Sequence, residues 1–290
     1  MAKIEAAHLN TYANIIQLLL QDRGRKLSPG INIRSYTGKG VRVVDQVDVV
    51  EATEIIGRHT DTEITDPDQT ARWAFPRDWG VASMIDKEDL IRMMTDPQSE
   101  FAEAQMKSIG RKHDDAVIDA FFTDTAKVGQ DGTETITFSA DGGTQVAAGG
   151  VGMTVAKLRA AKKALMANEV DIDNDELWCG LTAEQHDDLL TETQAINLDY
   201  TNKPVLVEGA ITSFMGFRFL HSERFTVDGS ADRRCPAWAK SGMVLGLWNA
   251  IETDVSKRAD KWNNLQIMAK STFGATRTEG KKIVEILCVE

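Results

Sequence analysis

The chain has 290 residues, enough for one large domain or two ordinary ones with a real hydrophobic core. Its formal net charge of −11 argues against a dedicated nucleic-acid-binding protein, because such proteins carry a basic face. No apolar run approaches the roughly 20 residues of a membrane helix, and the N-terminus lacks the pattern of a secretory signal. The three cysteines, Cys179, Cys235 and Cys288, have no CxxC spacing, so we expect buried thiols in a reducing compartment.

Residues 6–22 have the spacing of an amphipathic helix, with Leu9, Ile16 and Leu20 on one face. Such a helix can be an arm that docks on a partner chain, or it can pack on its own domain. The sequence leaves both readings open.

An extended hairpin is predicted next. The run VRVVDQVDVVEATEI (41–55) alternates well enough for a long strand, a polar tip follows, and ARWAFPRDWG (71–80) returns as the second strand. Because an isolated two-stranded hairpin is marginal in water, this one must lie on its own body or on a neighbouring chain.

Aromatic and basic residues interleave on the returning strand. They can stack on nucleic-acid bases, or they can anchor a protein interface, where Trp and Arg are enriched. The acidic balance of the chain favours the interface. The candidate inter-subunit residues are therefore Arg72, Trp73, Phe75, Arg77 and Trp79.

A long helix is predicted from residue 97 to residue 123. Asp96 at the N-cap and Pro97 at the first helical position form a good start signal, and no later proline interrupts the helix. About 25 residues span roughly 37 Å at 1.5 Å per residue. One face is expected to carry Met106, Ile109, His113, Val117, Ala120 and Phe121.

The middle of the chain is rich in glycine, but it carries no phosphate-binding motif. Residues 129–152 contain neither GxxxxGK[ST] nor GxGxxG, and we expect one short strand at 135–138 between loops. Thr154 is expected to cap a helix, residues 176–181 to form a buried strand, and Thr182 with Gln185 to form a capping box.

The stretch GAITSFMGFRFLHSERF (209–225) gathers four phenylalanines around Gly216, which permits a tight bend. After it we expect a strand on which Phe217 and Phe219 share one face. Residues 237–250 are apolar enough for a buried strand pair, and the C-terminal region alternates strand and turn up to IVEILCVE.

The order of these elements resembles the major capsid protein of tailed bacteriophages, the Hong Kong 97-type fold. Residues 209–225 are similar to the family's Gly-aromatic strand with a Ser-containing polar exit. KSTFGATRTEGKKIVEIL (270–287) looks like the family's closing hairpin, although the proline often seen near Glu279 is missing.

The resemblance implies an α+β fold, and Phe217 and Phe219 then belong to a core rather than to a pocket wall. Its implied parts are an N-terminal arm at 1–35, an extended loop at 36–90, a peripheral domain with a spine helix at 91–153, an axial domain at 154–250, and return strands to the peripheral domain at 251–290.

The resemblance also implies a structural protein rather than an enzyme, with no metal and no cofactor. Copies of the chain would assemble through hexamers and pentamers into an icosahedral shell around phage double-stranded DNA, which they touch weakly and non-specifically. The expected place is the virion, after assembly in the host bacterial cytoplasm and without a membrane. The expected partners are a portal, decoration proteins and, since the fold-like pattern starts almost at Met1, a separate scaffolding protein or none.

Two alternatives stay open. An encapsulin-like nanocompartment shell would share the fold, and genome neighbours would distinguish it. A soluble mixed-fold enzyme would instead use His186 and the acidic turn at residues 171–175, although that turn lacks the Gly and the distal Glu of a calcium loop.

Overall fold

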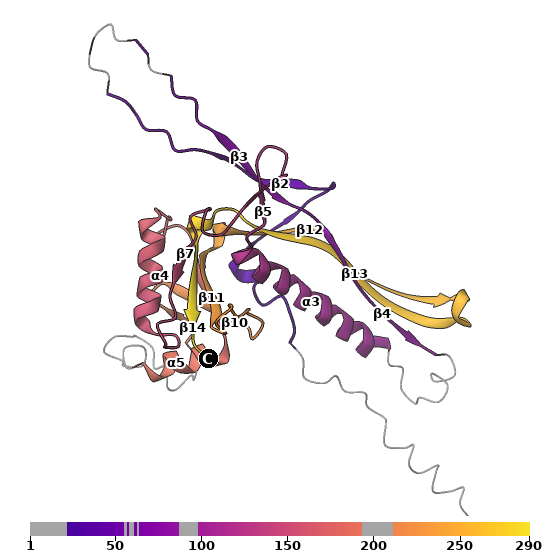
Figure 1. Ribbon diagram of the computed structural model, residues 1–290. Coiled ribbons are helices and arrows are strands. Elements are labelled where there is room, and N and C mark those ends of the chain that lie inside the picture. The colour runs from indigo at the N-terminus through magenta and orange to yellow at the C-terminus, as the bar shows by residue number, and fades with distance from the viewer. Residues whose placement is uncertain (1–21, 55–56, 58–60, 63, 87–97, 193–210) are drawn as a thin grey trace, which may run out of the picture.

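A computed structural model describes residues 22–54, 57, 61–62, 64–86, 98–192 and 211–290. Within these residues, three sheets and three α-helices form a body with two projecting arms (Figure 1). One arm is the excursion, which we define as residues 41–74, and the other is a long twisted hairpin. The predicted helix at 6–22 falls almost entirely outside the described residues, and segments 87–97 and 193–210 lie outside them as well.

A four-stranded sheet forms the hairpin arm. Its order is β1-β12-β13-β4, with β1 parallel to β12 and the other neighbours antiparallel. The strands are β1 (Asn32–Ser35), β12 (Met243–Arg258), β13 (Asn264–Arg277) and β4 (Arg77–Ile85). Residues 71–80 therefore do not form one strand: they divide at Pro76, and β4 pairs with β13 instead of continuing the predicted hairpin.

The excursion begins from a second, smaller sheet of order β2-β3-β5-β6. Its strands are β2 (Val41–Val47), β3 (Gln69–Ala74), β5 (Ala126–Val128) and β6 (Glu134–Ile136). The antiparallel pairing of β2 with β3 confirms the predicted hairpin at its base. The first strand is shorter than predicted, because residues 48–54 form no strand.

The third sheet is the centre of the body. Its order is β7-β14-β11-β8-β10-β9. The strands are β7 (Thr144–Val146), β14 (Ile283–Cys288), β11 (Arg233–Ala239), β8 (Leu177–Leu181), β10 (Phe217–His221) and β9 (Ser213–Phe214). The predicted strand at 176–181 is confirmed as fully buried β8, and the bend at Gly216, with φ of +87°, joins β9 to β10 as expected.

The sequence prediction was wrong about which strands pair near the C-terminus. The strands within 237–250 do not pair with each other, since β11 and β12 lie in different sheets. The expected closing hairpin at 270–287 is also absent, because β13 belongs to the hairpin arm and β14 to the six-stranded sheet. A short 3-10 helix, η5 (Gly280–Lys282), carries the chain from one sheet to the other.

The long helix is confirmed as α3 (Gln98–Phe122), which lies along the four-stranded sheet (Figure 1). Ile109, Val117 and Phe121 are buried as predicted, but Met106 is 43% exposed. His113 is a packing residue whose ring lies 4.0 Å from that of Phe273, and its burial, with the nearby charge of Arg25, lowers its pKa to about 4. None of the described helices is long and apolar enough to cross a membrane.

Both shorter helices begin at the predicted caps. In α4 (Val155–Ala167) the hydroxyl of Thr154 accepts a hydrogen bond from the Lys157 amide, and α5 (Ala183–Thr191) begins with a capping box of Thr182 and Gln185.

The six-stranded sheet separates two hydrophobic cores. One core lies under α4 and α5 and includes Phe217, with Phe219 packed against it. The other lies towards α3 and contains Trp238. Neighbouring residues of β11 face opposite cores because side chains alternate along a strand. All three cysteines are unpaired and buried in the first core, as expected.

Candidate interaction groove

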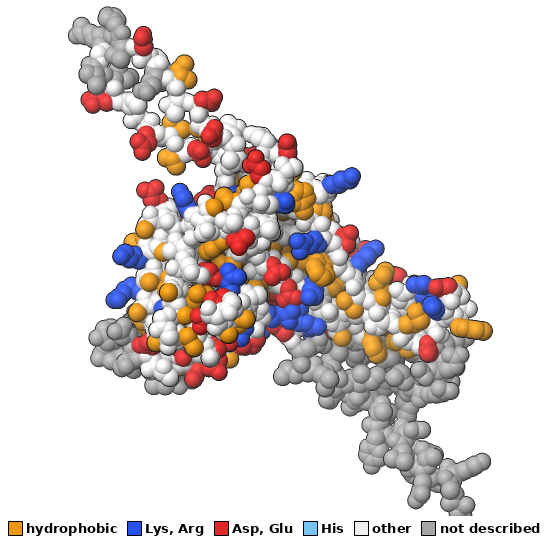
Figure 2. Space-filling view, viewed as in Figure 1, with side chains coloured by type: hydrophobic (Ala, Val, Ile, Leu, Met, Phe, Trp, Pro, Cys, Tyr) orange, Lys and Arg blue, Asp and Glu red, His pale blue; other side chains and the backbone are white. Residues whose placement is uncertain are grey.

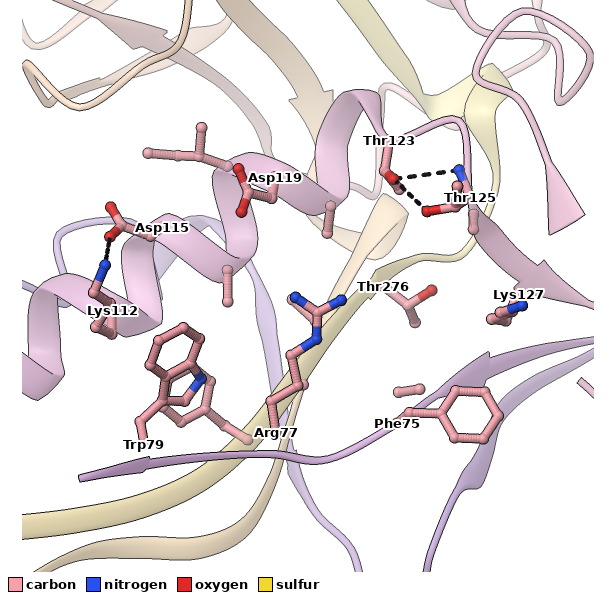
Figure 3. Close-up of a pocket in the computed structure, with 18 of the residues that line it drawn as sticks. Phe75, Arg77, Trp79, Lys112, Asp115, Asp119, Thr123, Thr125, Lys127 and Thr276 are labelled. Atoms are coloured by element: carbon pink, nitrogen blue, oxygen red, sulfur yellow. Dashed lines mark hydrogen bonds and ion pairs between the residues drawn. The ribbon is translucent and has the colours of Figure 1, made fainter.

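A groove of about 590 Å³ lies between α3 and the strands that follow the excursion (Figure 3). It contains four of the five predicted interface residues, Trp73, Phe75, Arg77 and Trp79. The fifth, Arg72, points elsewhere: it is 7% exposed and forms an ion pair with Asp141 inside the chain. The alternation of the sequence therefore placed most of the set on one surface, but not all of it.

The position of Phe75 in the groove depends on a close approach between two strands. A Cβ atom on Gly274 of β13 would lie 2.2 Å from the carbonyl oxygen of Phe75. This contact is with backbone, which cannot turn aside as a flexible side chain does. Gly274 thus lets the chain cross β13 at the point where it leaves β3 and enters β4.

We expect Gly274→Ala to destabilise the folded chain by about 1–3 kcal/mol, because the methyl group forces the crossing apart. Gly80→Ala in β4 is the matched control, since its added methyl would lie an ordinary 3.8 Å from the Ala269 carbonyl oxygen. The measurement is urea unfolding of both variants. Equal midpoints would show that the crossing tolerates a side chain.

Aromatic rings form the floor of the groove. Trp79 stacks on Phe273, with ring centroids 6.2 Å apart and an interplanar angle of 18°. Trp73 stacks on Phe75 at the same separation, and its indole nitrogen donates a hydrogen bond of 2.8 Å to the carbonyl oxygen of Gly129. Trp73 therefore also holds the 129–132 loop, so it is a structural residue as well as a groove residue.

The rim of the groove is basic, with four Lys or Arg side chains against two carboxylates. Asp115 is already neutralised: Arg224 donates two hydrogen bonds of 2.6 and 2.7 Å to it, and Lys112 lies 3.1 Å away. Burial alone would raise the pKa of the Asp115 carboxyl, but these cations outweigh it and hold that pKa below its ordinary value. The groove keeps a net charge of +2 in a chain whose net charge is −11.

Arg77 is, with Lys127, one of the two groove cations that no carboxylate pairs with among the described residues. Its side chain rises from β4 towards α3, between Trp79 and Phe75 (Figure 3). No ion pair or side-chain hydrogen bond engages it among the described residues. A free guanidinium between the exposed ring of Phe75 and the half-buried ring of Trp79 suits an acidic and apolar partner.

A buried charge cluster lies behind the groove, at the base of the excursion. Asp141 accepts hydrogen bonds from Arg72 and, at 2.8 Å, from Nε of Arg277. The Arg277 guanidinium also donates to the carbonyl oxygens of Thr123 and Ile136. The cluster joins β3, β13 and the 139–143 loop. No local pattern in the sequence indicates it, because its members are far apart along the chain.

The residues of the alternative enzymatic site form hydrogen bonds within the protein. Asp171 accepts hydrogen bonds from the backbone and the side chain of Asn174, and Asp175 accepts one from the Ser241 amide. Nε2 of His186 accepts a hydrogen bond from the Ile211 amide at 3.2 Å. Among the described residues, no three His, Cys, Asp or Glu side chains lie close enough to hold a metal ion. The acidic segment is a turn.

A sequence comparison matches residues 4–290 to the model of a family described as phage capsid protein. A comparison with curated proteins found no match. The family match therefore rests on nearly the whole length of the chain.

Solved capsid structures share the fold. The chain superposes on a protein of Mycobacterium phage Che8 with a TM-score of 0.72 and 14% identity, covering 95% of each chain. For the cyanophage Pam1 capsid the TM-score is 0.74 with 13% identity, covering 96% of this chain and 95% of that one. For the capsid of Helicobacter pylori bacteriophage KHP30 the values are 0.68 and 11%, with 96% and 94% covered. These matches confirm the Hong Kong 97-type fold and support neither the encapsulin-like nor the enzyme alternative.

Proposed function

Since the chain belongs to the phage capsid protein family, we propose that its copies assemble through hexamers and pentamers into an icosahedral shell that encloses double-stranded DNA. The family match over residues 4–290 makes the chain a structural protein of a capsid shell, and so a component of the virion.

The excursion carries the argument for contact between copies. Val49 is 90% exposed and Ile64 is 88% exposed, and residues 48–54 pair with no strand. Extended backbone and large apolar side chains in water are poorly stable alone, so a neighbouring chain is needed to cover them.

The groove suits the excursion of a neighbouring copy by charge. Residues 45–68 contain eight acidic residues and one basic residue. The groove has a net charge of +2, an aromatic floor and the free Arg77. We therefore keep Trp73, Phe75, Arg77 and Trp79 as the proposed inter-subunit residues and remove Arg72 from that set.

The two main parts of the molecule are assigned from their sheets. We propose that the six-stranded sheet with α4 and α5 is the axial part, and that the four-stranded sheet with α3 is the peripheral part. The boundary proposed at residue 250 then moves, because β12 runs unbroken through it and belongs to the peripheral part. Strand β14 joins the axial part through its pairing with β11, and β4 leaves the extended loop for the peripheral part.

We also propose that the shell forms in the bacterial cytoplasm with a portal, decoration proteins and a separate scaffolding protein, and that packaged DNA makes only weak, non-specific contact with it. The acidic net charge supports weak contact, since strong binding would need basic side chains. The test is size-exclusion chromatography with light scattering, followed by negative-stain microscopy. The chain would be expressed alone and with its flanking genes. Shells or rings support the proposal, and a monomer or dimer under every condition overturns it.

Arg77→Glu should reduce the yield of assembled particles by at least about tenfold, because a like charge then faces the acidic excursion. Folding should be unchanged, since Arg77 has no partner in its own chain among the described residues. The same reversal at exposed Arg34, on β1 at the opposite edge of the sheet, is the control. Normal particle yield from Arg77→Glu would show that the groove is not an interface.

A further inference from the structure

The two shorter helices carry opposite charges. Helix α4 contains four basic residues and no acidic one, whereas α5 contains three acidic residues and neither Lys nor Arg. Both helices pack on the same core of the six-stranded sheet. Figure 2 shows basic side chains projecting from the α4 side of the body and acidic ones near α5.

None of the four cations on α4 forms an ion pair with a described residue. Lys157 is buried and donates hydrogen bonds to the carbonyl oxygens of Val151 and Leu287, so it is a structural residue. Lys162 donates to the carbonyl oxygen of Met215 at 2.9 Å. Arg159 and Lys163 are exposed and have no ion pair or side-chain hydrogen bond among the described residues.

An apolar hollow lies beside these cations. It has a volume of about 410 Å³ and is lined by Met166, Ala167, Met215 and three basic residues, Arg159, Lys162 and Lys163. Met166 is 60% exposed. Methionine is flexible and polarisable, and it is common at surfaces that contact another protein. The hollow favours a protein over nucleic acid, because a phosphate backbone gains nothing from exposed methionines.

Two of the three acidic side chains of α5 likewise have no ion-pair partner among the described residues. Asp188 accepts a hydrogen bond of 2.8 Å from the Met153 amide and so holds α5 against the start of α4. Glu184 and Asp187 are exposed, and no cation pairs with them among the described residues. One copy of the chain therefore presents a basic helix face and an acidic helix face that do not satisfy each other.

We propose that the basic face of α4 (Arg159, Lys163, Met166) docks on the acidic face of α5 (Glu184, Asp187) of a second copy. Such a contact joins two different surfaces, so successive copies follow one another around an axis and a suitable rotation closes a ring. The inference deepens the proposed shell function and rests on it, since it names the contact that would close a capsomer.

Electrostatics make this contact selective. Each copy has a net charge of −11, so copies repel one another wherever their acidic surfaces meet. The basic face of α4, in contrast, attracts an acidic surface of a neighbouring copy. Complementary charges of this kind fix orientation and suppress wrong contacts. They also make assembly sensitive to salt, because exposed charges are screened within about 10 Å at 0.1 M.

The test exchanges the charges on the full chain, expressed with its flanking genes. Arg159→Glu/Lys163→Glu should lower the yield of assembled particles by at least about tenfold, since like charges would then face each other. Glu184→Lys/Asp187→Lys should do the same. The variant that carries all four substitutions should recover most of the yield, because attraction is restored in reverse. As a control, Lys39→Glu/Lys257→Glu makes the same change of net charge as Arg159→Glu/Lys163→Glu, but at exposed positions outside both helices.

The outcomes separate this inference from the proposed function. If the wild-type chain forms particles and either charge-reversed variant forms them with normal yield, the helix contact is wrong, whereas the proposed shell function is still supported. An equal loss in the Lys39/Lys257 control, or no recovery in the fourfold variant, would also overturn it. If the wild-type chain forms no particle at all, the proposed function fails and this inference fails with it.

A cross-link provides a readout that does not depend on yield. A carbodiimide couples a lysine amine directly to a carboxylate with no spacer, so only groups in contact react. In particles assembled from a mixture of light-isotope and heavy-isotope chains, we expect mixed-isotope peptides that join Lys163 to Glu184 or Asp187. Lys163 coupled only within its own copy, or only to other segments, would contradict the proposal.

Discussion

Asp141→Ala is expected to destabilise the folded chain by about 3–5 kcal/mol, because it leaves two buried guanidinium groups without a counter-charge. Arg72 is 7% exposed and Arg277 is fully buried, and Asp141 is the carboxylate that both contact. Removing one partner of a buried ion pair is costly, because the remaining charge stays out of water. The excursion should detach first, since Arg72 lies on its second strand.

The measurement is the free energy of unfolding in urea, on chains kept unassembled by Arg77→Glu. The matched control is Asp45→Ala, which removes one partner of the exposed Arg42–Asp45 ion pair. Exposed pairs contribute about 0–1 kcal/mol, so the control should stay close to the parent chain. Similar losses in the two variants would show that the buried cluster behaves like a surface pair.

The buried cluster contains two arginines and one aspartate, so it carries one unbalanced positive charge. A further variant can therefore tell whether the stability lost in Asp141→Ala comes from charge balance or from side-chain packing. Nη1 of Arg72 is buried and has no hydrogen-bond partner among the described residues. Arg72→Met would leave the Arg277–Asp141 pair neutral, so it should cost less than Asp141→Ala. The opposite order would mean that packing of the Arg72 side chain, and not charge balance, holds the excursion.

Local signals in the sequence were sufficient for the three helices that the structure describes. Thr154, Thr182 and the apolar spacing of α3 act within four residues, and each predicted element formed. The pairing of strands and charges that lie far apart in the sequence could not be predicted from local signals. Strand β4 pairs with β13 about 190 residues later, and Arg277 reaches Asp141 across 136 positions. Alternation of apolar and polar residues indicates that a segment is a strand, but it does not indicate which other strand that segment pairs with.

The groove shows the same division. The aromatic and basic pattern at residues 72–79 identified one wall, but nothing in it indicated that α3 would supply the other through Lys112 and Asp115. Arg72 was misplaced for a physical reason. It is only one residue from Trp73, and successive side chains of a strand point to opposite faces, so one faces the groove and the other the interior.

Trp238→Ala should be about as destabilising as the loss of Asp141, at about 3–5 kcal/mol, because a large cavity would open between the two parts of the molecule. Trp238 is fully buried on β11, and its ring lies 4.7 Å from that of Phe121 on α3. Its indole nitrogen donates a hydrogen bond of 2.7 Å to the carbonyl oxygen of Gly30. One side chain therefore joins the six-stranded sheet, α3 and the segment that precedes β1.

Two further variants divide this effect into its parts. Trp238→Phe keeps most of the volume but leaves the buried Gly30 carbonyl unpaired, so it should cost about 1–3 kcal/mol in urea unfolding. Trp262→Ala is the control: this tryptophan is 89% exposed at the tip of the hairpin arm, so its loss should change the unfolding free energy by less than about 0.5 kcal/mol. If Trp238→Ala unfolds in one transition, the axial and peripheral parts form one cooperative unit. Two separate transitions would mean that each part folds alone and that Trp238 only fixes the angle between them, which a closed shell needs to be constant.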